Sequence, residues 1–196
     1  MKTLAIFDFD GTITYKDSLK EFIVYSHGKT KFYKGLLTLS PILVAYKLGV
    51  ISNHKAKETL ISYFFKGWEF KDFKKVASDF SLYQLPKLVK KSALERIEWH
   101  KNQSHDVVIV SASMECWLKP WCQENKIDLI STKLEIKNGK LTGKFLTKNC
   151  HGIEKVNRLL EKYDLNNYKF IYAYGDSKGD KEILKIANKK FYKYFK

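Results

Sequence analysis

The sequence contains little cysteine and almost no arginine. Its three cysteines, Cys116, Cys122 and Cys150, are an odd number without a CxxC spacing. They indicate neither a disulfide framework nor a zinc site, and reduced thiols are the simplest interpretation. Arginine occurs only at Arg96 and Arg158, so lysine makes up nearly all of the 36 basic residues. Because bidentate recognition of phosphates and bases favours arginine, we expect no nucleic acid partner.

The charge of the chain is strongly positive. Its 36 basic residues outnumber 21 acidic ones, which gives a net charge of +15. This excess leaves room for an anionic partner, either a phosphorylated substrate or an anionic membrane surface. In a second interpretation the surplus lysine serves only solubility. The oligomeric state does not follow from these numbers.

A long hydrophobic run is also missing. The most apolar segment extends from Gly35 to Tyr46, lies between Lys34 and Lys47, and contains Pro41. Because a membrane span needs about 20 apolar residues, this segment predicts a helix that is buried or lies at an interface. The apolar stretch at the N-terminus is too short for a signal peptide. We therefore expect a cytoplasmic protein, either free or peripheral at the inner face of the membrane.

The first hundred residues predict one strand and a group of helices. A short apolar run at 3–9 is typical of a buried parallel strand, and it ends in acidic residues and glycine. A capping-box pattern at Ser18–Glu21 predicts the start of a helix, and Gly28 predicts its end. Further breaks occur near residues 41, 49–53, 67 and 86. Four or five helices without a strand predict a compact helical module before residue 104.

After Asp106, predicted strands and helices alternate. The β-branched run 107–110 predicts a strand that is buried on both faces. Asn138-Gly139 suits the turn of a hairpin over 134–142. The other expected elements are helices at 114–125 and 154–163, strands at 127–131 and 169–174, a loop at 175–180 and a final helix.

This order of elements predicts an α/β fold with a doubly wound, Rossmann-like parallel sheet. Residues 1–13 and 102–196 would build the sheet and its flanking helices. Residues 14–101 would form a helical module inserted after the first strand. With 196 residues, of which 44% are hydrophobic, the chain suffices for one sizeable core and a small satellite.

Three predicted strands end in polar residues, in the segments DFDGT (8–12), SAS (111–113) and GDSKGD (175–180). In a doubly wound sheet the carboxyl ends of the strands meet at one edge, where ligands bind. Four aspartates pressed together there would raise one another's pKa, and a divalent cation relieves this. Carboxylate oxygens with few nitrogen or sulfur donors favour Mg²⁺, which also binds phosphate oxygens. Lys155 can supply positive charge on the far side of such a phosphate.

The segments DFDGT, VSAS, GIEK and GDSKGD, in this order and after matching strands, resemble the four motifs of the haloacid dehalogenase superfamily. The resemblance extends from Asp8 to Asp180 and implies a helical C1-type cap domain at 14–101. It implies that Asp8 is the nucleophile, Asp10 the general acid and base, and Asp180 a residue that orients a metal-bound water or Lys155. The phosphoryl group would be held by Gly11, Thr12, Ser111, Ala112 and Lys155. Mg²⁺ would be bound by Asp8, Asp176 and Asp10, the last through its backbone carbonyl.

Elementary chemistry agrees with these roles. Asp8 can attack phosphorus and form an aspartyl phosphate, which splits one difficult displacement into two easier ones. Asp10 can protonate the leaving oxygen and later take a proton from water. Mg²⁺, Lys155 and the Ser111 hydroxyl can stabilise charge on the equatorial oxygens.

Each of these residues also has an interpretation without catalysis. The aspartates of DFDGT can be turn acids, Asp180 an acid at a helix N-terminus, and Lys155 one solvated lysine among many. Ser111 can be a helix-capping hydroxyl. Ser113 is better placed to cap the following helix, and we expect no catalytic role for it.

Within the superfamily, the sequence is most similar to the phosphoserine-phosphatase-like IB branch, on the position of the cap, the hairpin KLEIKNGKLTG and the stretch before Lys155. Asp17 stands where true phosphoserine phosphatases carry a glutamate, and residues 14–95 contain no arginine to hold a substrate carboxylate. The segments LLTLSPILVAYKLGVI, CHGIEKVNRL and YGDSKGDKEIL resemble phosphatidylglycerophosphatase C, which implies a lipid phosphate substrate. The first segment would then lie at a membrane interface, or would otherwise be the core stripe of the cap.

The sequence therefore predicts a Mg²⁺-dependent phosphomonoesterase that acts through an aspartyl phosphate. Its substrate is either a lipid phosphate such as phosphatidylglycerophosphate or a small soluble phosphomonoester such as phosphoserine. A phosphotransferase would use the same residues. The alternative from a different class is a basic lipid- or nucleic-acid-binding protein on an inactive scaffold.

Overall fold

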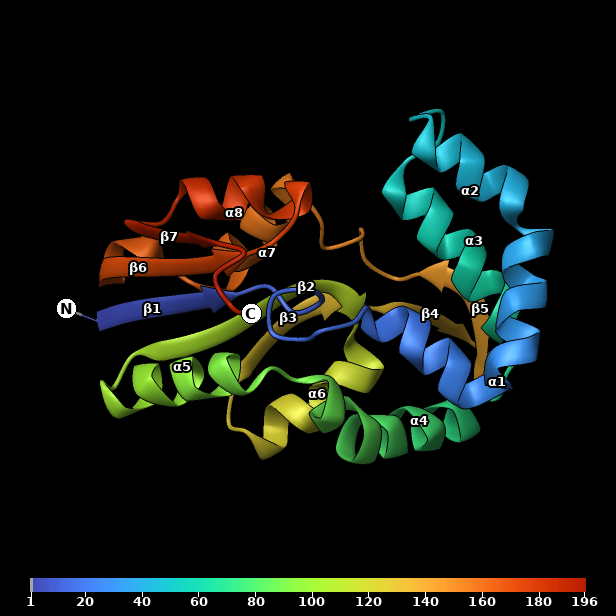
Figure 1. Cartoon of the computed structure of the whole chain (residues 1–196), viewed down its shortest axis with the longest axis horizontal. Coiled ribbons are helices and arrows are strands. Elements are labelled where there is room, and N and C mark those ends of the chain that lie inside the picture. The colour runs from blue at the N-terminus through green and yellow to red at the C-terminus, as the bar shows by residue number, and fades with distance from the viewer. Residues whose placement is uncertain (1) are drawn as a thin grey trace.

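The computed structural model describes residues 2–196. One half of the molecule is built around a five-stranded parallel sheet with the strand order β3-β2-β1-β6-β7 (Figure 1). The strands are β1 (Lys2–Phe7), β2 (Asp106–Met114), β3 (Asp128–Thr132), β6 (Tyr168–Gly175) and β7 (Lys189–Tyr192). The predicted α/β fold with a doubly wound parallel sheet is confirmed.

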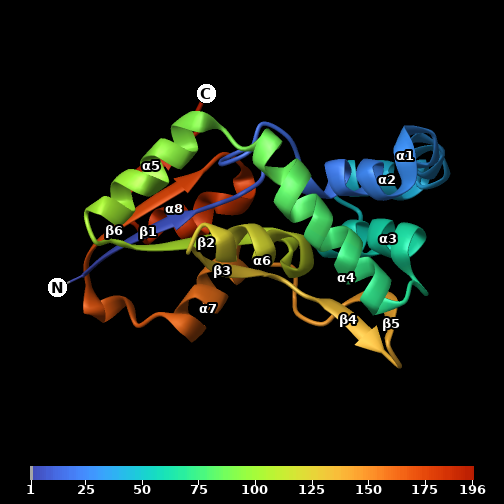
Figure 2. The same ribbon diagram turned by 90° about the horizontal axis from the view of Figure 1, so that it is seen from below.

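Helices cover both faces of this sheet (Figures 1 and 2). Alternate residues of the central strand enter two different cores, since Ala5 and Phe7 belong to one cluster and Leu4 and Ile6 to the other. The first core includes residues of α5 (Lys91–Asn102) and α6 (Glu115–Glu124). The second includes residues of α7 (Ile153–Lys162) and α8 (Lys181–Lys185). Burial on both faces explains why β1 and β2 read as continuous apolar runs.

The insert after β1 forms the other half of the molecule (Figure 1). Its helices are α1 (Ser18–Thr38), α2 (Ser40–Lys47), α3 (Asn53–Phe65) and α4 (Phe70–Asp79), followed by a π-turn at Phe80–Gln84 and a 3-10 turn at Leu85–Leu88. An aromatic cluster joins the insert to the sheet domain. The ring of Phe22 stacks on Trp117 at 4.6 Å and packs against Phe65, Phe73 and Phe80.

The first helix of the insert differs in one detail from the prediction. Its N-cap is Asp17, whose side chain accepts the backbone N–H of Lys20 at 2.9 Å, so the predicted capping box beginning at Ser18 is wrong by one residue. The predicted break at Gly28 is confirmed, because this glycine has φ +80° and interrupts the helical backbone.

The predicted hairpin consists of β4 (Leu134–Lys137) and β5 (Lys140–Phe145). Both turn residues, Asn138 and Gly139, have positive φ, as a type I′ turn requires. The hairpin forms its own two-stranded sheet and packs against α3, where the backbone N–H of Phe145 donates to Glu58 at 3.1 Å.

Two features bear on the division of the chain into core and cap. Helix α5 lies along the parallel sheet and buries Ala93 and Ile97 in its core, although it falls within the predicted cap range 14–101. The hairpin contacts α3, although it falls within the predicted core range 102–196. The division itself stays a prediction, and these contacts favour a boundary before α5.

The edge strand β7 is absent from the prediction, which ended with a helix. It pairs in parallel with β6, with Tyr174 opposite Phe191. Its sequence, KKFY, begins with two lysines, which are common on edge strands but hide the strand pattern. Within residues 2–196, no helix combines the length and apolar character that a membrane crossing needs.

Two neighbouring segments connect the insert to the sheet domain. Thr14 and Val89 form an antiparallel bridge, and the backbone N–H of Lys90 donates to the carbonyl of Ile13 at 2.8 Å. The chain therefore enters and leaves the insert through two hydrogen-bonded segments next to the DFDGT loop.

Candidate active site

The three polar segments predicted from the sequence meet at the carboxyl edge of the sheet. Asp8 follows β1 directly, and its backbone N–H donates to the carbonyl of Tyr174 at the end of β6. Carboxylate oxygens of Asp8, Asp176 and Asp180 lie within 4.8 Å of one another. Three acidic groups so close together form a strongly negative site that suits a cation.

Lys155 lies among these carboxylates. Its side chain is only 2% exposed, and Nζ lies 2.5 Å from Oδ1 of Asp8 and 2.6 Å from Oδ1 of Asp180. Burial alone would lower the pKa of Lys155, but the two carboxylates outweigh it and raise this pKa above its ordinary value. Lys155 therefore stays charged, and its interpretation as a solvated surface lysine does not hold.

Burial has the opposite effect on Asp8, whose pKa it raises to about 7 although the Lys155 ammonium works against this shift. Burial also raises the pKa of Asp176, and the charge of Asp180 adds to this shift. The ionised forms of both aspartates would be stabilised by an additional positive charge in the site.

Asp180 accepts more hydrogen bonds than the other two carboxylates. Besides the bond from Lys155, its Oδ2 accepts the backbone N–H groups of Asp176 and Ser177 and the hydroxyl of Ser177. Burial tends to raise its pKa, yet Lys155 and these donors hold it below the ordinary value. Asp180 is thus held in its ionised form by these partners, and its orienting role stays a prediction.

Thr12 and Gly11 lie next to the carboxylates of Asp8 and Asp176. The Thr12 hydroxyl lies between Oδ2 of Asp8, at 3.1 Å, and Oδ1 of Asp176, at 3.2 Å. Gly11 has φ +80°, and a Cβ at this position would lie 2.9 Å from the carboxyl carbon of Asp176. Only glycine allows the loop to approach Asp176 so closely.

Asp10 points away from this cluster toward the insert. Its Oδ1 accepts the backbone N–H of Ser18 at 2.6 Å, and its Oδ2 accepts the hydroxyl of Ser113. Burial raises the pKa of Asp10 to about 6, and the charge of Asp17 adds to this shift. The group of three carboxylates does not include that of Asp10. A metal-binding role for Asp10 through its backbone carbonyl stays a prediction.

Ser113 is a residue of the site whose role no sequence motif indicates. It was expected to cap α6, but the N-cap of α6 is Met114, without a side-chain cap bond, while Ser113 binds Asp10 and Ser18. The spacing carried a usable signal, because residues two apart in a strand share a face. Ser111 is buried and accepts the backbone N–H of Ser113 at 3.1 Å.

Two charged residues of the insert lie near Asp10 and the end of β2. Asp17, the N-cap of α1, is close enough to Asp10 to raise its pKa. Lys57 of α3 donates from Nζ to the carbonyl of Ala112 at 3.4 Å. Asp17 could be named from the sequence, whereas no motif distinguishes Lys57 from the other lysines.

A cavity of about 360 Å³ adjoins these two residues within the insert. Its walls are mostly apolar and come from α1, α2 and α3, with Asp17, Lys20 and Lys57 as its charged members. The apolar lining includes Phe32, Leu36, Leu43 and Leu60. Because Lys57 lines the cavity and also binds Ala112, this cavity adjoins the end of β2 that carries Ser111 and Ser113.

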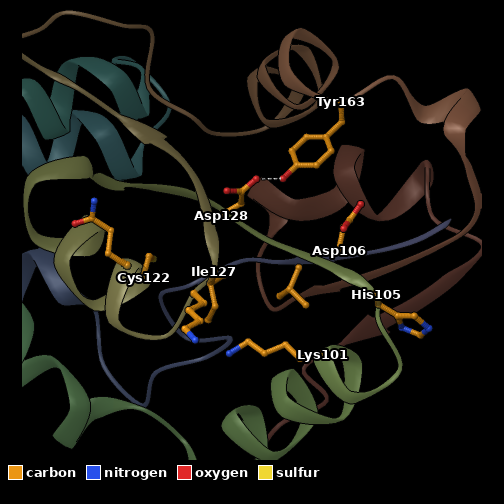
Figure 3. A pocket seen from close by; sticks show the side chains of 10 residues that line it. Lys101, His105, Asp106, Cys122, Ile127, Asp128 and Tyr163 are labelled. Carbon is orange, nitrogen blue, oxygen red and sulfur yellow. Dashed lines mark hydrogen bonds between the residues drawn. The ribbon is translucent and has the colours of Figure 1, made fainter.

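A larger cavity, of about 460 Å³, lies at the opposite edge of the sheet, where β2 and β3 begin (Figure 3). Its two aspartates already have partners, since Tyr163 donates to Asp128 at 2.5 Å and Tyr168 donates to Asp106 at 2.8 Å. Ligands of doubly wound sheets bind at the carboxyl edge, so the candidate functional site is the one around Asp8.

Comparison with known proteins identifies the family. The family model of haloacid dehalogenase-like hydrolases matches residues 5–185. The chain belongs to this family. Protein CicA of Caulobacter vibrioides is 33% identical over 195 residues, which cover 98% of the chain and 86% of CicA. A protein of Mycobacterium tuberculosis named as a probable phosphatase is 27% identical over 95% of the chain and 67% of its own length.

A solved structure of phosphoserine phosphatase in its apo form shares the fold of this hydrolase. The two superpose with a TM-score of 0.68 at 18% identity, over 98% of the chain and 86% of the phosphatase. The superfamily predicted from the sequence is confirmed by the family model. Membership of the IB branch and the resemblance to phosphatidylglycerophosphatase C stay predictions.

Proposed function

We propose that this hydrolase is a Mg²⁺-dependent phosphatase that acts through an aspartyl-phosphate intermediate. One observation carries the proposal. A buried carboxylate, Asp8, meets a buried ammonium, Lys155, at the carboxyl edge of the sheet, while a second carboxylate, Asp10, faces the insert with a raised pKa. A nucleophile, a fixed positive charge and a separate proton donor are the groups that phosphoryl transfer to a carboxylate requires.

The residues around Asp8 fit a magnesium ion. The donors are carboxylate oxygens, and Gly11 keeps the space beside Asp176 free of a side chain. Asp8, Asp176 and the backbone carbonyl of Asp10 would hold the ion, with Asp180 supporting them. When bound, Mg²⁺ would supply positive charge that polarises the phosphoryl group and keeps the carboxylates ionised.

In the first step a carboxylate oxygen of Asp8 attacks phosphorus, and the bond from phosphorus to the leaving oxygen breaks. Asp10, protonated in part near neutral pH because burial raises its pKa to about 6, transfers its proton to the leaving oxygen. Lys155 and the backbone N–H groups of Gly11, Thr12 and Ala112 would hold the phosphoryl oxygens, together with the Ser111 hydroxyl.

In the second step water attacks the phosphorus of the aspartyl phosphate. Asp10, now ionised, takes a proton from this water, and the bond from phosphorus to Asp8 breaks. The products are inorganic phosphate, free Asp8 and protonated Asp10, so the enzyme returns to its starting state.

Hydrolysis of p-nitrophenyl phosphate, with Mg²⁺ and with EDTA, tests this proposal. We expect activity only with Mg²⁺, and Asp8→Asn should abolish it. Glu124→Gln, which neutralises an exposed acid far from the site, is the matched control and should behave like the wild type. Activity in EDTA, or an active Asp8→Asn variant, would contradict the proposed mechanism. Transfer of phosphate to an added alcohol in place of water would identify a phosphotransferase.

We further propose that the leaving group carries an apolar substituent, as in a lipid phosphate such as phosphatidylglycerophosphate. The support is the largely apolar cavity beside Asp17 and Lys57. An acyl chain or glycerolipid would bury its surface against Leu36 and Leu43 at roughly 25 cal/mol per Å². Phosphoserine offers no such surface, and residues 14–95 contain no arginine for its carboxylate.

Leu43→Ser tests the lipid substrate. We expect kcat/KM to fall about tenfold or more for phosphatidylglycerophosphate in mixed micelles and to stay nearly constant for p-nitrophenyl phosphate, since only the former fills the cavity. Leu160→Ser, on the exposed face of α7, is the control. A wild-type enzyme that prefers phosphoserine would overturn this assignment and leave the phosphatase itself intact.

The tip of the insert supports a peripheral association with an anionic membrane. None of the eight described residues of α2 is fully buried. Leu37, Leu48 and Val50 are each 74% exposed or more, and the neighbouring Lys34 and Lys47 are exposed as well. Apolar side chains can enter the headgroup region, while each lysine near an anionic surface contributes about 1 kcal/mol.

Co-sedimentation with phosphatidylglycerol vesicles tests this association. We expect binding at low salt that weakens at high salt, and little binding to phosphatidylcholine vesicles. The combined substitution Leu37→Ser, Leu48→Ser and Val50→Ser should reduce binding, whereas Leu160→Ser should not. Equal binding by the triple variant would show that this tip is not the contact surface.

A further inference from the structure

Lys90 is a buried lysine that the proposed chemistry leaves unexplained. It directly precedes α5 at the exit from the insert and is 8% exposed. Its Nζ donates to two backbone carbonyls, that of Gly11 at 2.7 Å and that of Phe195 at 3.2 Å. Both of these hydrogen bonds end on carbonyl oxygens and neither on a carboxylate.

Such an environment is costly for an ammonium group. Burial lowers the pKa of Lys90, and the nearby charge of Asp176 only partly offsets this. A methionine of similar length would occupy the same space without this desolvation penalty. The contacts that the charged group makes are therefore the feature to explain.

These contacts converge on the loop that carries the site. The backbone N–H of Lys90 binds the carbonyl of Ile13, while its side chain binds the carbonyl of Gly11. The same ammonium also binds Phe195, whose ring packs against Tyr174 at the end of β6. Lys90 thus joins the exit of the insert, the DFDGT loop and the C-terminal segment at one point.

The bond to Gly11 determines the orientation of the next peptide group. The C=O of Gly11 and the N–H of Thr12 belong to one planar trans peptide, so they point in opposite directions. When Lys90 holds the carbonyl, the Thr12 N–H is directed to the other side. The Thr12 side chain starts from the same peptide group and reaches Asp8 and Asp176.

We propose that Lys90 is a positioning residue, which holds the Gly11 carbonyl so that the Thr12 N–H and hydroxyl are aligned with Asp8 and Asp176. This inference rests on the proposed phosphatase activity, because the aligned groups serve the phosphoryl site. It adds a residue from the exit of the insert, outside the four motifs, to the support of that site. A misplacement of about 1 Å in such a loop can cost about 10²-fold in rate.

The first test is the turnover of p-nitrophenyl phosphate per folded molecule by Lys90→Met. We expect kcat to fall about 10²-fold, with a smaller change in KM, because alignment in the transition state is lost. Lys91→Met is the matched control and should retain wild-type kcat. Lys91 is exposed, and its Nζ forms an ion pair of 3.8 Å with the exposed Glu95. Lys90→Arg keeps the charge and the N–H donors and should recover part of the rate. A folded Lys90→Met enzyme with kcat within twofold of the wild type would overturn the proposal.

Hydrogen exchange gives a readout that does not depend on activity. We expect backbone amides of residues 9–14 to exchange at least about tenfold faster in Lys90→Met, and unchanged exchange there in Lys91→Met. Unchanged exchange in Lys90→Met would reject the positioning role even if the wild type proved to be no phosphatase. If Lys90→Met does not fold, kcat and loop exchange are compared between Lys90→Arg and Lys90→Gln. Only Lys90→Arg keeps the positive charge, so it should be the closer of the two to the wild type. Equal kcat and equal loop exchange in these two variants would reject the role of the ammonium.

Discussion

Gly11 and Gly49 have nearly the same backbone conformation but different surroundings. Their φ angles are +80° and +75°, a region that costs other residues roughly 1–2 kcal/mol. A Cβ at Gly11 would collide with Asp176, whereas no atom lies within 4 Å of a Cβ at Gly49. Alanine substitutions at the two positions therefore separate the effect of backbone strain, which both share, from the effect of a Cβ that collides with Asp176, which only Gly11 has.

We expect Gly11→Ala and Gly49→Ala to lower the free energy of unfolding by similar amounts, about 1 kcal/mol for the strained backbone. Only Gly11→Ala should also lose phosphatase activity, about 10²-fold or more, because Asp176 must move. Urea unfolding and a p-nitrophenyl phosphate assay measure the two effects. Full activity of a folded Gly11→Ala variant would show that the close approach to Asp176 has no catalytic importance.

At the scale of the element, the start of α1 combines a structural and an electrostatic role. Asp17 caps the helix through Lys20, and its charge contributes to the raised pKa of the neighbouring Asp10, after burial as the main cause. Asparagine can still cap a helix but carries no charge, while alanine can do neither. Two substitutions at this single position therefore distinguish the two roles.

We expect Asp17→Asn to retain the stability of the wild type and Asp17→Ala to lose about 1 kcal/mol. Both variants remove a negative charge beside Asp10, which lowers the pKa of Asp10. The alkaline limb of kcat, where the general acid loses its proton, should then shift to lower pH in both. An unchanged pH profile with altered stability would assign Asp17 to the helix alone.

At the scale of the whole molecule, a buried hydrogen-bond chain ties α5 to the sheet behind the site. Arg96 donates to the Tyr174 hydroxyl at 2.7 Å, this hydroxyl lies 2.9 Å from Nε2 of His100, and Nδ1 of His100 lies 2.8 Å from His105. A hydroxyl that accepts from Arg96 keeps its own O–H free to donate to Nε2 of a neutral His100. Burial and the Arg96 charge lower the pKa of His100 to about 3.

The sign of the resulting pH dependence follows from proton binding. Between the ordinary pKa near 6.5 and about 3, unfolded His100 binds a proton that folded His100 does not. Stability therefore rises with pH in this window and is lost as the pH falls below about 6.5. Urea unfolding from pH 7.5 to 4.5 should show a steeper acid loss for the wild type than for His100→Gln. The variant should be less stable at pH 7.5, because it breaks the chain. Parallel curves of stability against pH for the two proteins would exclude His100 as the source of the acid loss.

The sequence by itself determined the fold class and the chemistry at the strand ends. The apolar runs of β1 and β2, the Asn138-Gly139 turn and the break at Gly28 each depend on a few neighbouring residues. Strand direction and right-handed crossovers then bring the carboxyl ends to one edge, so Asp8 and Asp176 could be expected together. Local pattern and topology sufficed for these features.

The tertiary structure alone decided which other residues serve the site. Ser113 reaches Asp10 across 103 positions of sequence, and Lys90 reaches Gly11 across 79. One serine and one lysine resemble many others in the chain until packing selects them. Contacts of this kind depend on how the two halves of the molecule fit together, and no period in the sequence records that fit.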